Sequence, residues 1–268
     1  MTIINRFWNM AKQASIDAFA AYRAMGPRKW FSLWLTWRPE KIVSLNGIKL
    51  AIRTRTMKLK LADLCMAVEC ILFKEYTPEG FEIKKTDTVV DVGGHIGSFS
   101  LLAAKNARKV YTFEPSPNNY AQLVKNAKIN GFKNMNPINQ AVASKKGTLK
   151  LYIDPLNTAA NSLYQKSDKY VSVKATTLPE FFKKNKITKC DFLKLDCEGA
   201  EYDILLNLDA KTLGKIKKIV CEYHEPLSFG IKNPEFTPEN VAAHLRKNKF
   251  TVLVKKIKTY QGMIYAKK

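Results

Sequence analysis

One stretch decides the fold of this 268-residue chain: VVDVGGHIGSFS, residues 89–100. Its first residues form a short apolar strand, which runs into a glycine-rich turn, and a helical pattern follows from Leu101. A second apolar strand comes next, and it ends in the acid Glu114. This order of strand, glycine turn, helix, strand and acid is typical of a βαβ unit that binds a nucleotide cofactor.

The residues of the turn separate two kinds of cofactor. A dinucleotide fingerprint that ends at Gly97 requires glycine at position 92, where this chain has Val92. Asp91 directly precedes the turn, and a carboxylate there disfavours a pyrophosphate, which binds to backbone N–H groups. An acid in this position suits a cofactor that has a cationic centre and no phosphate. The turn therefore indicates S-adenosylmethionine rather than a nicotinamide dinucleotide.

Composition bounds the class of protein. The chain is 46% hydrophobic, enough for one large domain, and 45 Lys and Arg against 23 Asp and Glu give a net charge of +22. This charge predicts attraction to nucleic acid, to an anionic membrane or to an acidic substrate, or else a coat of solvated lysines. The five cysteines form neither a CxxC pair nor a metal-binding spacing, which is typical of reduced thiols in a cytoplasmic protein. The first thirty residues lack the apolar run of a signal peptide.

Residues 1–45 differ from the rest, since all four tryptophans lie there among basic residues and apolar residues at helical spacing. The helical pattern includes Phe7, Ala11, Ile16, Phe19 and Tyr22. We predict a helical N-terminal extension over 1–45 and an α/β domain over 46–268. Two interpretations of the extension remain open. It packs on the domain as a helical addition, or it forms an interfacial helix or substrate lid that contacts a membrane peripherally.

The remainder alternates strands and helices, which predicts a mainly parallel sheet. Asn46-Gly47 predicts a hairpin between Ile42 and Arg53, and a helix is expected over 59–76. Further strands are expected at 88–92, 109–113, 136–142, 191–196, 217–223, 250–257 and 260–266. Further helices are expected at 96–106, 117–130, 178–185, 200–208 and 237–248. The last two strands must be antiparallel because only a couple of residues join them. Residues 145–175 are expected to form an insertion near the substrate side.

Ligands of open α/β sheets bind beyond the carboxyl ends of the strands, and this rule gathers candidate residues from five strands. They are Asp91, Gly93, Gly94, His95 and Gly97; Glu114, Pro115 and Ser116; Asn139, Gln140 and Ala141; Asp196, Glu198 and Gly199; and Glu222, Tyr223 and His224. The first two groups, together with Gln140, Ala141 and Asp196, are predicted to hold the cofactor. Glu114 suits the ribose diol of an adenosyl group, since a carboxylate accepts two hydrogen bonds.

The predicted catalytic residues lie on the fourth and fifth strands. Lys194, Asp196 and Glu198 alternate onto one face of a strand, where charges are rare unless they are paired or functional. The alternative for Lys194 is a structural ion pair with a carboxylate. Glu222 and His224 repeat the pattern on the next strand. Histidine suits removal of a proton from a hydroxyl acceptor, and carboxylates with histidine alternatively bind a divalent metal ion.

These motifs resemble the FkbM family of S-adenosylmethionine-dependent methyltransferases, over about Val43 to Tyr223. The resemblance rests on DVGGHIG (91–97), FEP (113–115), NQAV (139–142) and KLDCEGAE (194–201). It implies an α/β class I methyltransferase (Rossmann-like) fold: a mainly parallel seven-stranded sheet with a C-terminal antiparallel hairpin and helices on both faces. It also implies O-methylation of a sugar, glycan or small-molecule hydroxyl.

The resemblance assigns roles residue by residue. It implies that Asp91, Gly93, Gly97, Glu114 and Ala141 contact the cofactor. It also implies that Asp196 lies beside the transferred methyl group. The chain has Gly94-His95 where alanine–asparagine is commoner in the family, which leaves the role of His95 open.

Two other functions remain alternatives. The charge of +22 is compatible with an RNA methyltransferase, although the Asn/Asp-Pro-Pro-Tyr/Phe motif for exocyclic amines is absent from the sequence. A non-catalytic binding protein on the same fold, attached to a membrane through residues 1–45, is the other.

Overall fold

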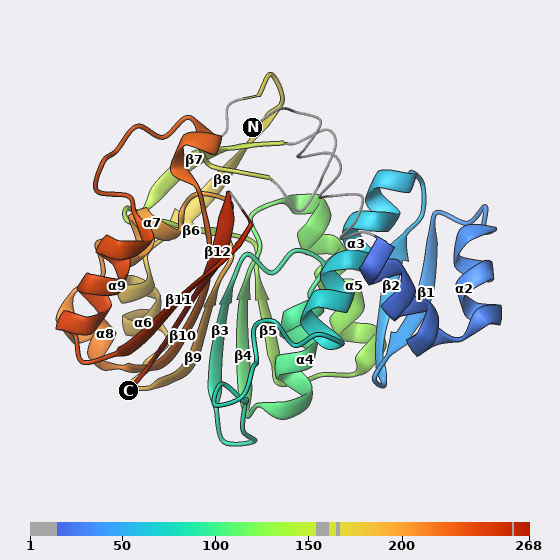
Figure 1. Ribbon diagram of the computed structural model, residues 1–268, viewed down its shortest axis with the longest axis horizontal. Helices are drawn as coiled ribbons and strands as arrows, with labels where there is room; N and C mark the ends of the chain where they lie inside the picture. Colours follow the sequence, from blue (N-terminus) through green and yellow to red (C-terminus); the bar gives the residue numbers. More distant parts are fainter. Residues whose placement is uncertain (1–14, 154–160, 165–166, 259) are drawn as a thin grey trace.

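A computed structural model of the chain describes residues 15–153, 161–164, 167–258 and 260–268. Its centre is a seven-stranded sheet (Figure 1). In spatial order the strands are β11 (Thr251–Lys258), β12 (Gln261–Lys267), β10 (Ile216–His224), β9 (Cys190–Leu195), β3 (Thr88–Val92), β4 (Lys109–Phe113) and β5 (Met135–Ile138). Strand β12 runs antiparallel to both of its neighbours, and the pairs from β10 to β5 are parallel. The predicted parallel sheet with a C-terminal antiparallel hairpin is confirmed.

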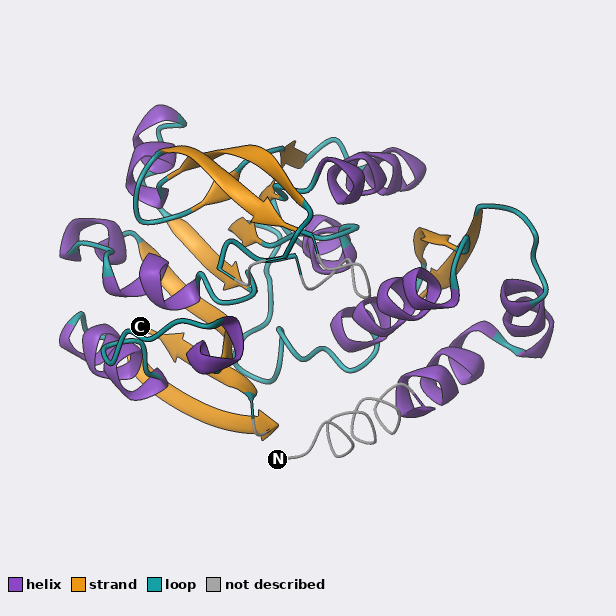
Figure 2. Cartoon of the chain, turned by 90° about the horizontal axis from the view of Figure 1, so that it is seen from above, coloured by secondary structure: helices purple, strands orange, loops and turns teal. Residues whose placement is uncertain are grey.

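Helices cover both faces of this sheet, as predicted (Figure 2). They are α3 (Met57–Ile71), α4 (Ser98–Asn106), α5 (Pro117–Asn130), α6 (Leu178–Lys184), α7 (Glu201–Leu206), α8 (Ala210–Gly214) and α9 (Pro238–Lys247). Alternation along the strands builds two cores. Val89 and Val110 pack with residues of α3, α4 and α5, whereas Val90 and Tyr111 pack with residues of α6, α7 and α9. The strands at 88–92 and 109–113 and the helix at 117–130 lie where the sequence predicts them.

The third predicted strand, 136–142, is wrong in its second half. The chain leaves the main sheet after Ile138, and the Asn139 side chain donates to the backbone oxygens of Glu114 and Pro115 at 2.8 and 3.0 Å. The following strand, β6 (Ala141–Val142), belongs to a second sheet. This turn explains why the segment predicted as one strand is divided between two sheets.

The predicted insertion at 145–175 contains most of that second sheet. Strands β7 (Gly147–Tyr152) and β8 (Tyr170–Thr176) are antiparallel, and β6 joins β8 in parallel. Leu151 and Leu163 from this region line the cavity described below. The insertion therefore lies on the side of the sheet where ligands bind, as expected from the sequence.

The N-terminal part packs on the α/β domain. Residues 15–25 are helical and precede α2 (Pro27–Trp34), β1 (Glu40–Leu45) and β2 (Ile48–Arg53). Asn46 and Gly47 have φ of 48° and 77°, the left-handed conformation that a tight hairpin turn requires. Ala21 and Leu33 are fully buried in the same core as α3. Phe7 and Ala11 of the predicted helical pattern lie outside the described residues.

The predicted domain boundary at residue 45 falls in the turn of the β1–β2 hairpin, between two paired strands. A test for membrane-spanning helices in the described part of the chain finds none with the length and apolarity to cross a bilayer.

Candidate active site

A cavity opens at the carboxyl ends of β3, β4, β9 and β10. The predicted site residues that line it are Gly93, His95, Glu114, Pro115, Gln140, Ala141, Asp196, Glu198 and Glu222. Its other lining residues are Met66, Val92, Phe113, Asn119, Val142, Leu151, Asn161, Leu163 and Cys197. Nine predicted residues are not among those that line it: Asp91, Gly94, Gly97, Ser116, Asn139, Lys194, Gly199, Tyr223 and His224. The topology thus brings the predicted groups to one edge of the sheet, in two layers.

The glycines of the turn are required by packing against neighbouring strands. Gly93 has a φ of 86°, and a Cβ atom there would lie 1.7 Å from the carbonyl oxygen of Asp196. A Cβ atom on Gly94 would lie 2.3 Å from Cγ2 of Thr112. Gly97 has a φ of 97° and precedes α4. At positions 93 and 94, the absence of a side chain lets β9 and β4 approach the turn.

Two backbone N–H groups hold the side chain of Glu114 in the wall of the cavity. Its two carboxylate oxygens accept hydrogen bonds from the N–H groups of His95 and Ser116, each at 2.8 Å. The side chain is buried, and burial raises its pKa to about 7. Ser116 is therefore a residue that positions Glu114 through its backbone rather than part of the cavity wall. A carboxylate fixed in this way keeps acceptor capacity for hydroxyl groups of a ligand.

His95 belongs to a buried polar network that begins in the N-terminal hairpin. The Arg53 guanidinium contacts Asp63 at 2.6 Å and lies 3.0 Å from Nε2 of His95. Another of its nitrogens donates to the side chain of Asn119 at 2.8 Å. Burial and the Arg53 charge lower the pKa of His95 well below its usual value, so this histidine is neutral and its Nε2 accepts the hydrogen bond. His95 therefore makes two structural contacts: its backbone N–H donates to Glu114, and its ring accepts from Arg53 of β2.

Asp91 and Lys194 form a buried ion pair across adjacent strands. The Lys194 Nζ lies 3.2 Å from Asp91 and 3.4 Å from Asp196, and it donates to the carbonyl oxygen of Gly93 at 2.8 Å. Asp91 also accepts a hydrogen bond from Ser100 at 2.5 Å. Burial alone would lower the pKa of Lys194, but the two carboxylates outweigh it and raise that pKa. This geometry supports the ion-pair interpretation of Lys194 over the catalytic one, because a permanently charged lysine behind the wall exchanges no proton.

Asp196 and Glu222 share one tyrosine. The hydroxyl group of Tyr76 lies 3.0 Å from Asp196 and 2.5 Å from Glu222, and Gln261 donates to the other oxygen of Glu222 at 2.7 Å. Burial, and then the charge of Asp196, raise the pKa of Glu222 to about 7. The single hydroxyl proton of Tyr76 serves one carboxylate at a time. Glu222 is therefore a group that takes up a proton near neutral pH.

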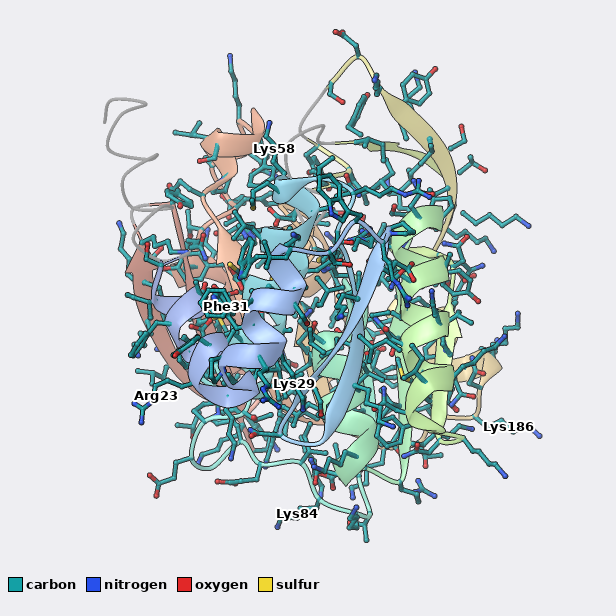
Figure 3. All side chains as sticks on the ribbon, turned by 90° about the vertical axis from the view of Figure 1, so that its right-hand side faces the viewer. Arg23, Lys29, Phe31, Lys58, Lys84 and Lys186 are labelled. Atoms are coloured by element: carbon teal, nitrogen blue, oxygen red, sulfur yellow. The ribbon has the colours of Figure 1, made fainter. Side chains whose placement is uncertain are left out.

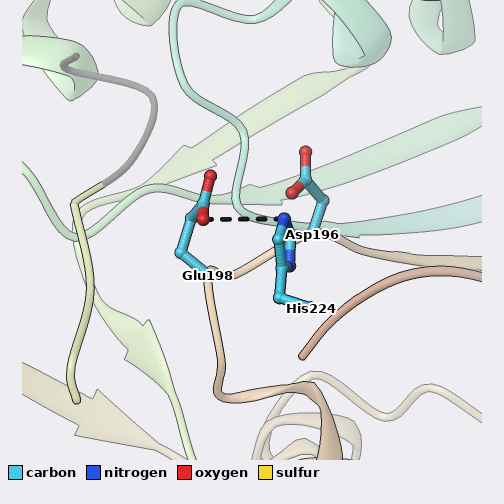
Figure 4. A group of neighbouring side chains, drawn as sticks. All are labelled: Asp196, Glu198 and His224. Atoms are coloured by element: carbon cyan, nitrogen blue, oxygen red, sulfur yellow. Dashed lines mark ion pairs between the residues drawn. The ribbon is translucent and has the colours of Figure 1, made fainter. Parts of the chain in front are cut away.

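His224 forms an ion pair with Glu198 (Figure 4). Its ring is oriented by Glu201. The ring Nδ1 donates to Glu201 at 2.9 Å, and Nε2 lies 3.5 Å from Glu198 and 3.6 Å from Glu222. Burial would lower the pKa of His224, but these carboxylates raise it well above its usual value. The pKa of Glu198 is raised to about 8 by burial, although the nearby His224 lowers it. Glu198 is thus the cavity-lining group of this pair that takes up a proton near neutrality.

Asp196, Glu198 and His224 also match the composition of a metal site. One ligand atom from each lies within 4.8 Å of the others. Two carboxylates and an imidazole suit several divalent cations, and the hydrogen bond from His224 to Glu201 is the support that metal-binding histidines usually have. The chemistry of these side chains is therefore compatible with the metal alternative as well as with proton transfer.

Sequence reasoning missed four residues that build the site. Glu201 stands in the quoted KLDCEGAE motif, but its role was visible only once its carboxylate was seen to accept from the backbone of Cys197 and Gly199. Tyr76, Arg53 and Asn119 come from segments outside the five strand ends. No spacing rule points to them, since Arg53 and Tyr76 precede the first strand of the main sheet and Asn119 lies within α5.

Together, the strand order, the glycine turn and the acid after β4 define a class I S-adenosylmethionine-dependent methyltransferase fold. The profile of the family described as "Methyltransferase FkbM domain" matches residues 91–252. The chain belongs to this family.

Individual relatives are distant. An uncharacterized protein of Methanocaldococcus jannaschii is 40% identical over 53 residues, which span 20% of this chain and 20% of that protein. Among solved structures, the methyltransferase FkbM of Methylobacillus flagellatus is similar with a TM-score of 0.48 and 13% identity, over 78% of this chain and 54% of that one. The structure of M. jannaschii TYW2 in complex with AdoMet is similar with a TM-score of 0.43 and 19% identity, over 87% of this chain and 87% of that one.

Proposed function

We propose that this protein is an S-adenosylmethionine-dependent O-methyltransferase that acts on a hydroxyl group of a sugar, glycan or small molecule. One observation carries the proposal: a single cavity has Glu114 on one wall and the acidic cluster of Asp196, Glu198 and Glu222 on another. The first is suited to an adenosyl group and the second to the removal of a proton. Family membership supports the class of reaction, and the cavity supports the role of each wall.

The residues near Glu114 fit an adenosyl group. Its carboxylate offers acceptors for the ribose diol, and Asn119 and Gln140 add polar groups to the same wall. Phe113, Val142 and Leu163 supply apolar surface suited to a base. The buried Lys194 and Asp91 neutralise each other, whereas Asp196, whose backbone packs against Gly93 of the turn, lines the cavity. A negative group there complements a sulfonium centre.

When bound, S-adenosylmethionine supplies an electrophilic methyl group. The protein must align the acceptor hydroxyl and accept its proton as the new carbon–oxygen bond forms. Glu198 is the group assigned to that proton: it lines the cavity, and its pKa is raised to about 8, so its carboxylate is a stronger base than an ordinary one. His224 stabilises the ionised carboxylate, and Glu201 fixes the ring that does so.

A divalent cation held by Asp196, Glu198 and His224 is a second way for the same residues to act, since a bound cation lowers the pKa of a coordinated hydroxyl. Both arrangements remove the same proton from the acceptor. They differ in whether turnover requires an added metal ion, which a chelator reveals.

Isothermal titration calorimetry with S-adenosylhomocysteine tests the cofactor wall. Glu114→Gln should weaken binding by about thirtyfold, because charge-assisted hydrogen bonds to a diol are lost. Glu79→Gln, at an exposed position, is the matched control and should bind like the parent. Absence of binding to the parent protein, or equal binding by the Glu114 variant, would refute the assignment.

Transfer of a labelled methyl group to pools of oligosaccharides, small hydroxylated metabolites and total RNA tests the acceptor class. Glu198→Gln should lower turnover by about a hundredfold and leave S-adenosylhomocysteine binding unchanged. Label confined to RNA would replace the proposal by the RNA alternative. No transfer to any pool, despite cofactor binding, would favour a non-catalytic protein.

A further inference from the structure

Exposed apolar side chains are concentrated near the N-terminus. Of the twelve large hydrophobic side chains that are exposed in the described residues, seven lie within residues 16–57, about a sixth of the chain. They are Ile16, Phe19, Phe31, Leu35, Trp37, Ile42 and Met57. Leu35 is 75% exposed and Trp37 is fully exposed. Single exposed hydrophobics need no explanation, but a concentration of this kind marks an interaction surface.

The charges of the same segment have one sign. Between residues 15 and 58, the exposed ionisable side chains are all Arg or Lys: Arg23, Arg28, Lys29, Arg38, Lys49, Arg55 and Lys58. The segment contains two acids. Asp17 is fully buried, and Glu40 is partly buried and paired with Lys125. A uniform lysine coat would scatter over the whole molecule, whereas here cations and bare apolar groups occur together without an exposed acid.

Helix geometry places these side chains on shared faces. Phe19 and Arg23 are four residues apart on the helix over 15–25, and Phe31 and Leu35 are four apart on α2 and its C-cap. The opposite side of α2 carries Leu33, which is buried in the core. Figure 3 shows Arg23, Lys29 and Phe31 on the side of the molecule that these helices form. We name Phe19, Arg23, Arg28, Phe31, Leu35 and Trp37 the N-terminal face.

We propose that the N-terminal face docks the protein on the surface of a bilayer that contains anionic lipid. Interfacial helices combine an apolar face with Lys and Arg, and bury the former among headgroups while the latter contact phosphates. Nucleic acid would explain the cations, but the aliphatic Leu35, which is 75% exposed, has no role in binding phosphates. The inference is independent of the proposed chemistry, because the face shares no residue with the cavity.

Both the cations and the apolar side chains of the N-terminal face should contribute measurably to binding of the bilayer. Each Lys or Arg at an anionic surface strengthens binding by about fivefold, so reversing two charges should weaken it by at least about twenty-five-fold. Replacing two large apolar side chains by serine should weaken it by about tenfold or more. The charge-reversal variant and the serine variant distinguish the two contributions to binding, because salt screens the contribution of the charges far more than that of the apolar side chains.

Flotation of the full-length chain with vesicles tests the proposal. Vesicles of phosphatidylcholine with phosphatidylglycerol should bind the protein, and vesicles of phosphatidylcholine alone should bind it much more weakly. Arg23→Glu with Arg28→Glu, and separately Phe31→Ser with Leu35→Ser, should each reduce recovery with the anionic vesicles. All four residues are exposed, so circular dichroism and thermal melting should show parent-like folding.

Matched controls come from the opposite end of the molecule, where α8 and α9 lie (Figure 1). Lys211→Glu with Lys247→Glu changes the net charge equally at exposed positions and should retain binding, as should Leu253→Ser. Equal loss with the control charges would show attraction by net charge alone and overturn the proposal. So would parent-like binding by the Phe31/Leu35 variant, or binding to RNA without binding to the vesicles at the same salt concentration.

Discussion

Replacing Lys194 by methionine tests whether this lysine holds the fold or takes part in the chemistry. The side chain is 1% exposed, and its ammonium group contacts Asp91 at 3.2 Å, Asp196 at 3.4 Å and the Gly93 carbonyl at 2.8 Å. Methionine matches the length of the side chain and removes the charge. The fully buried Asp91 then retains its hydrogen bond from Ser100 but loses its cation.

The expected loss of stability is large. Breaking a buried ion pair by removing one partner costs about 4 kcal/mol, because an uncompensated charge stays behind. With a urea m-value of about 3 kcal/mol/M for a chain of this size, the unfolding midpoint should fall by about 1.3 M. Asp91→Asn combined with Lys194→Met should be about 2 kcal/mol more stable than the sum of the two single losses, since the orphaned carboxylate is gone.

The assay is urea unfolding followed by circular dichroism at several pH values. Without Lys194, the pKa of Asp91 should be higher in the folded than in the unfolded chain, so its protonated form favours folding. The deficit of the variant should therefore be largest at neutral pH, and it should shrink as the pH falls from that raised pKa toward the ordinary pKa of an aspartate in the unfolded chain. Lys211→Met, at an exposed position, should stay within about 0.5 kcal/mol of the parent. An unchanged midpoint together with lost turnover would refute this reasoning and make Lys194 catalytic.

Three further outcomes are expected. Gly93→Ala should destabilise the protein by at least about 3 kcal/mol in the same urea assay, because its Cβ would lie 1.7 Å from the Asp196 carbonyl oxygen. Gly131→Ala is the control, because a Cβ atom there meets nothing within 4 Å. It should cost only about 1 kcal/mol, which is the cost of a φ of 68° for alanine. The kcat/KM for methyl transfer should fall about tenfold per pH unit below an apparent pKa of about 8, because Glu198 must be deprotonated to act as a base, and a flat profile would exclude that role. EDTA should leave turnover unchanged if Glu198 takes the proton directly. If EDTA abolishes turnover and added Mg²⁺ or Mn²⁺ restores it, Asp196, Glu198 and His224 are instead ligands of a metal ion.

The sequence predicts the sheet well because most of its strands are short apolar runs bounded by polar turns. It also predicts which strand ends meet, since the carboxyl ends of parallel strands share one edge. It does not separate the two layers at that edge. Asp91 and Glu114 both follow apolar runs, yet Asp91 forms a buried ion pair with Lys194, whereas Glu114 lines the cavity. The difference comes from side-chain packing across strands, which periodicity along one strand does not contain.

The same limit applies to residues that reach the site from other segments. Tyr76 precedes the glycine turn by about fifteen residues, yet its hydroxyl group contacts Asp196 and Glu222, which follow on two later strands. The hydroxyl group of Tyr76 is hydrogen-bonded and its ring packs against Phe99 in the core. No charge or repeat in the sequence distinguishes it from a structural tyrosine. A strand-end rule finds groups at the ends of strands and misses a loop residue that joins two of them.

The N-terminal hairpin, finally, takes part in building the cofactor wall. Arg53 ends β2, pairs with Asp63 of α3 and contacts the ring of His95, whose backbone N–H holds Glu114. Strand β2 is held in place by β1, along a register that runs from Glu40–Arg53 to Leu45–Ile48. A boundary at residue 45 would remove β1 and leave β2 as an unpaired strand, and the network that fixes Glu114 would lose one of its supports. The structural unit that positions the glycine turn therefore includes the β1–β2 hairpin, even though the family match begins only at residue 91.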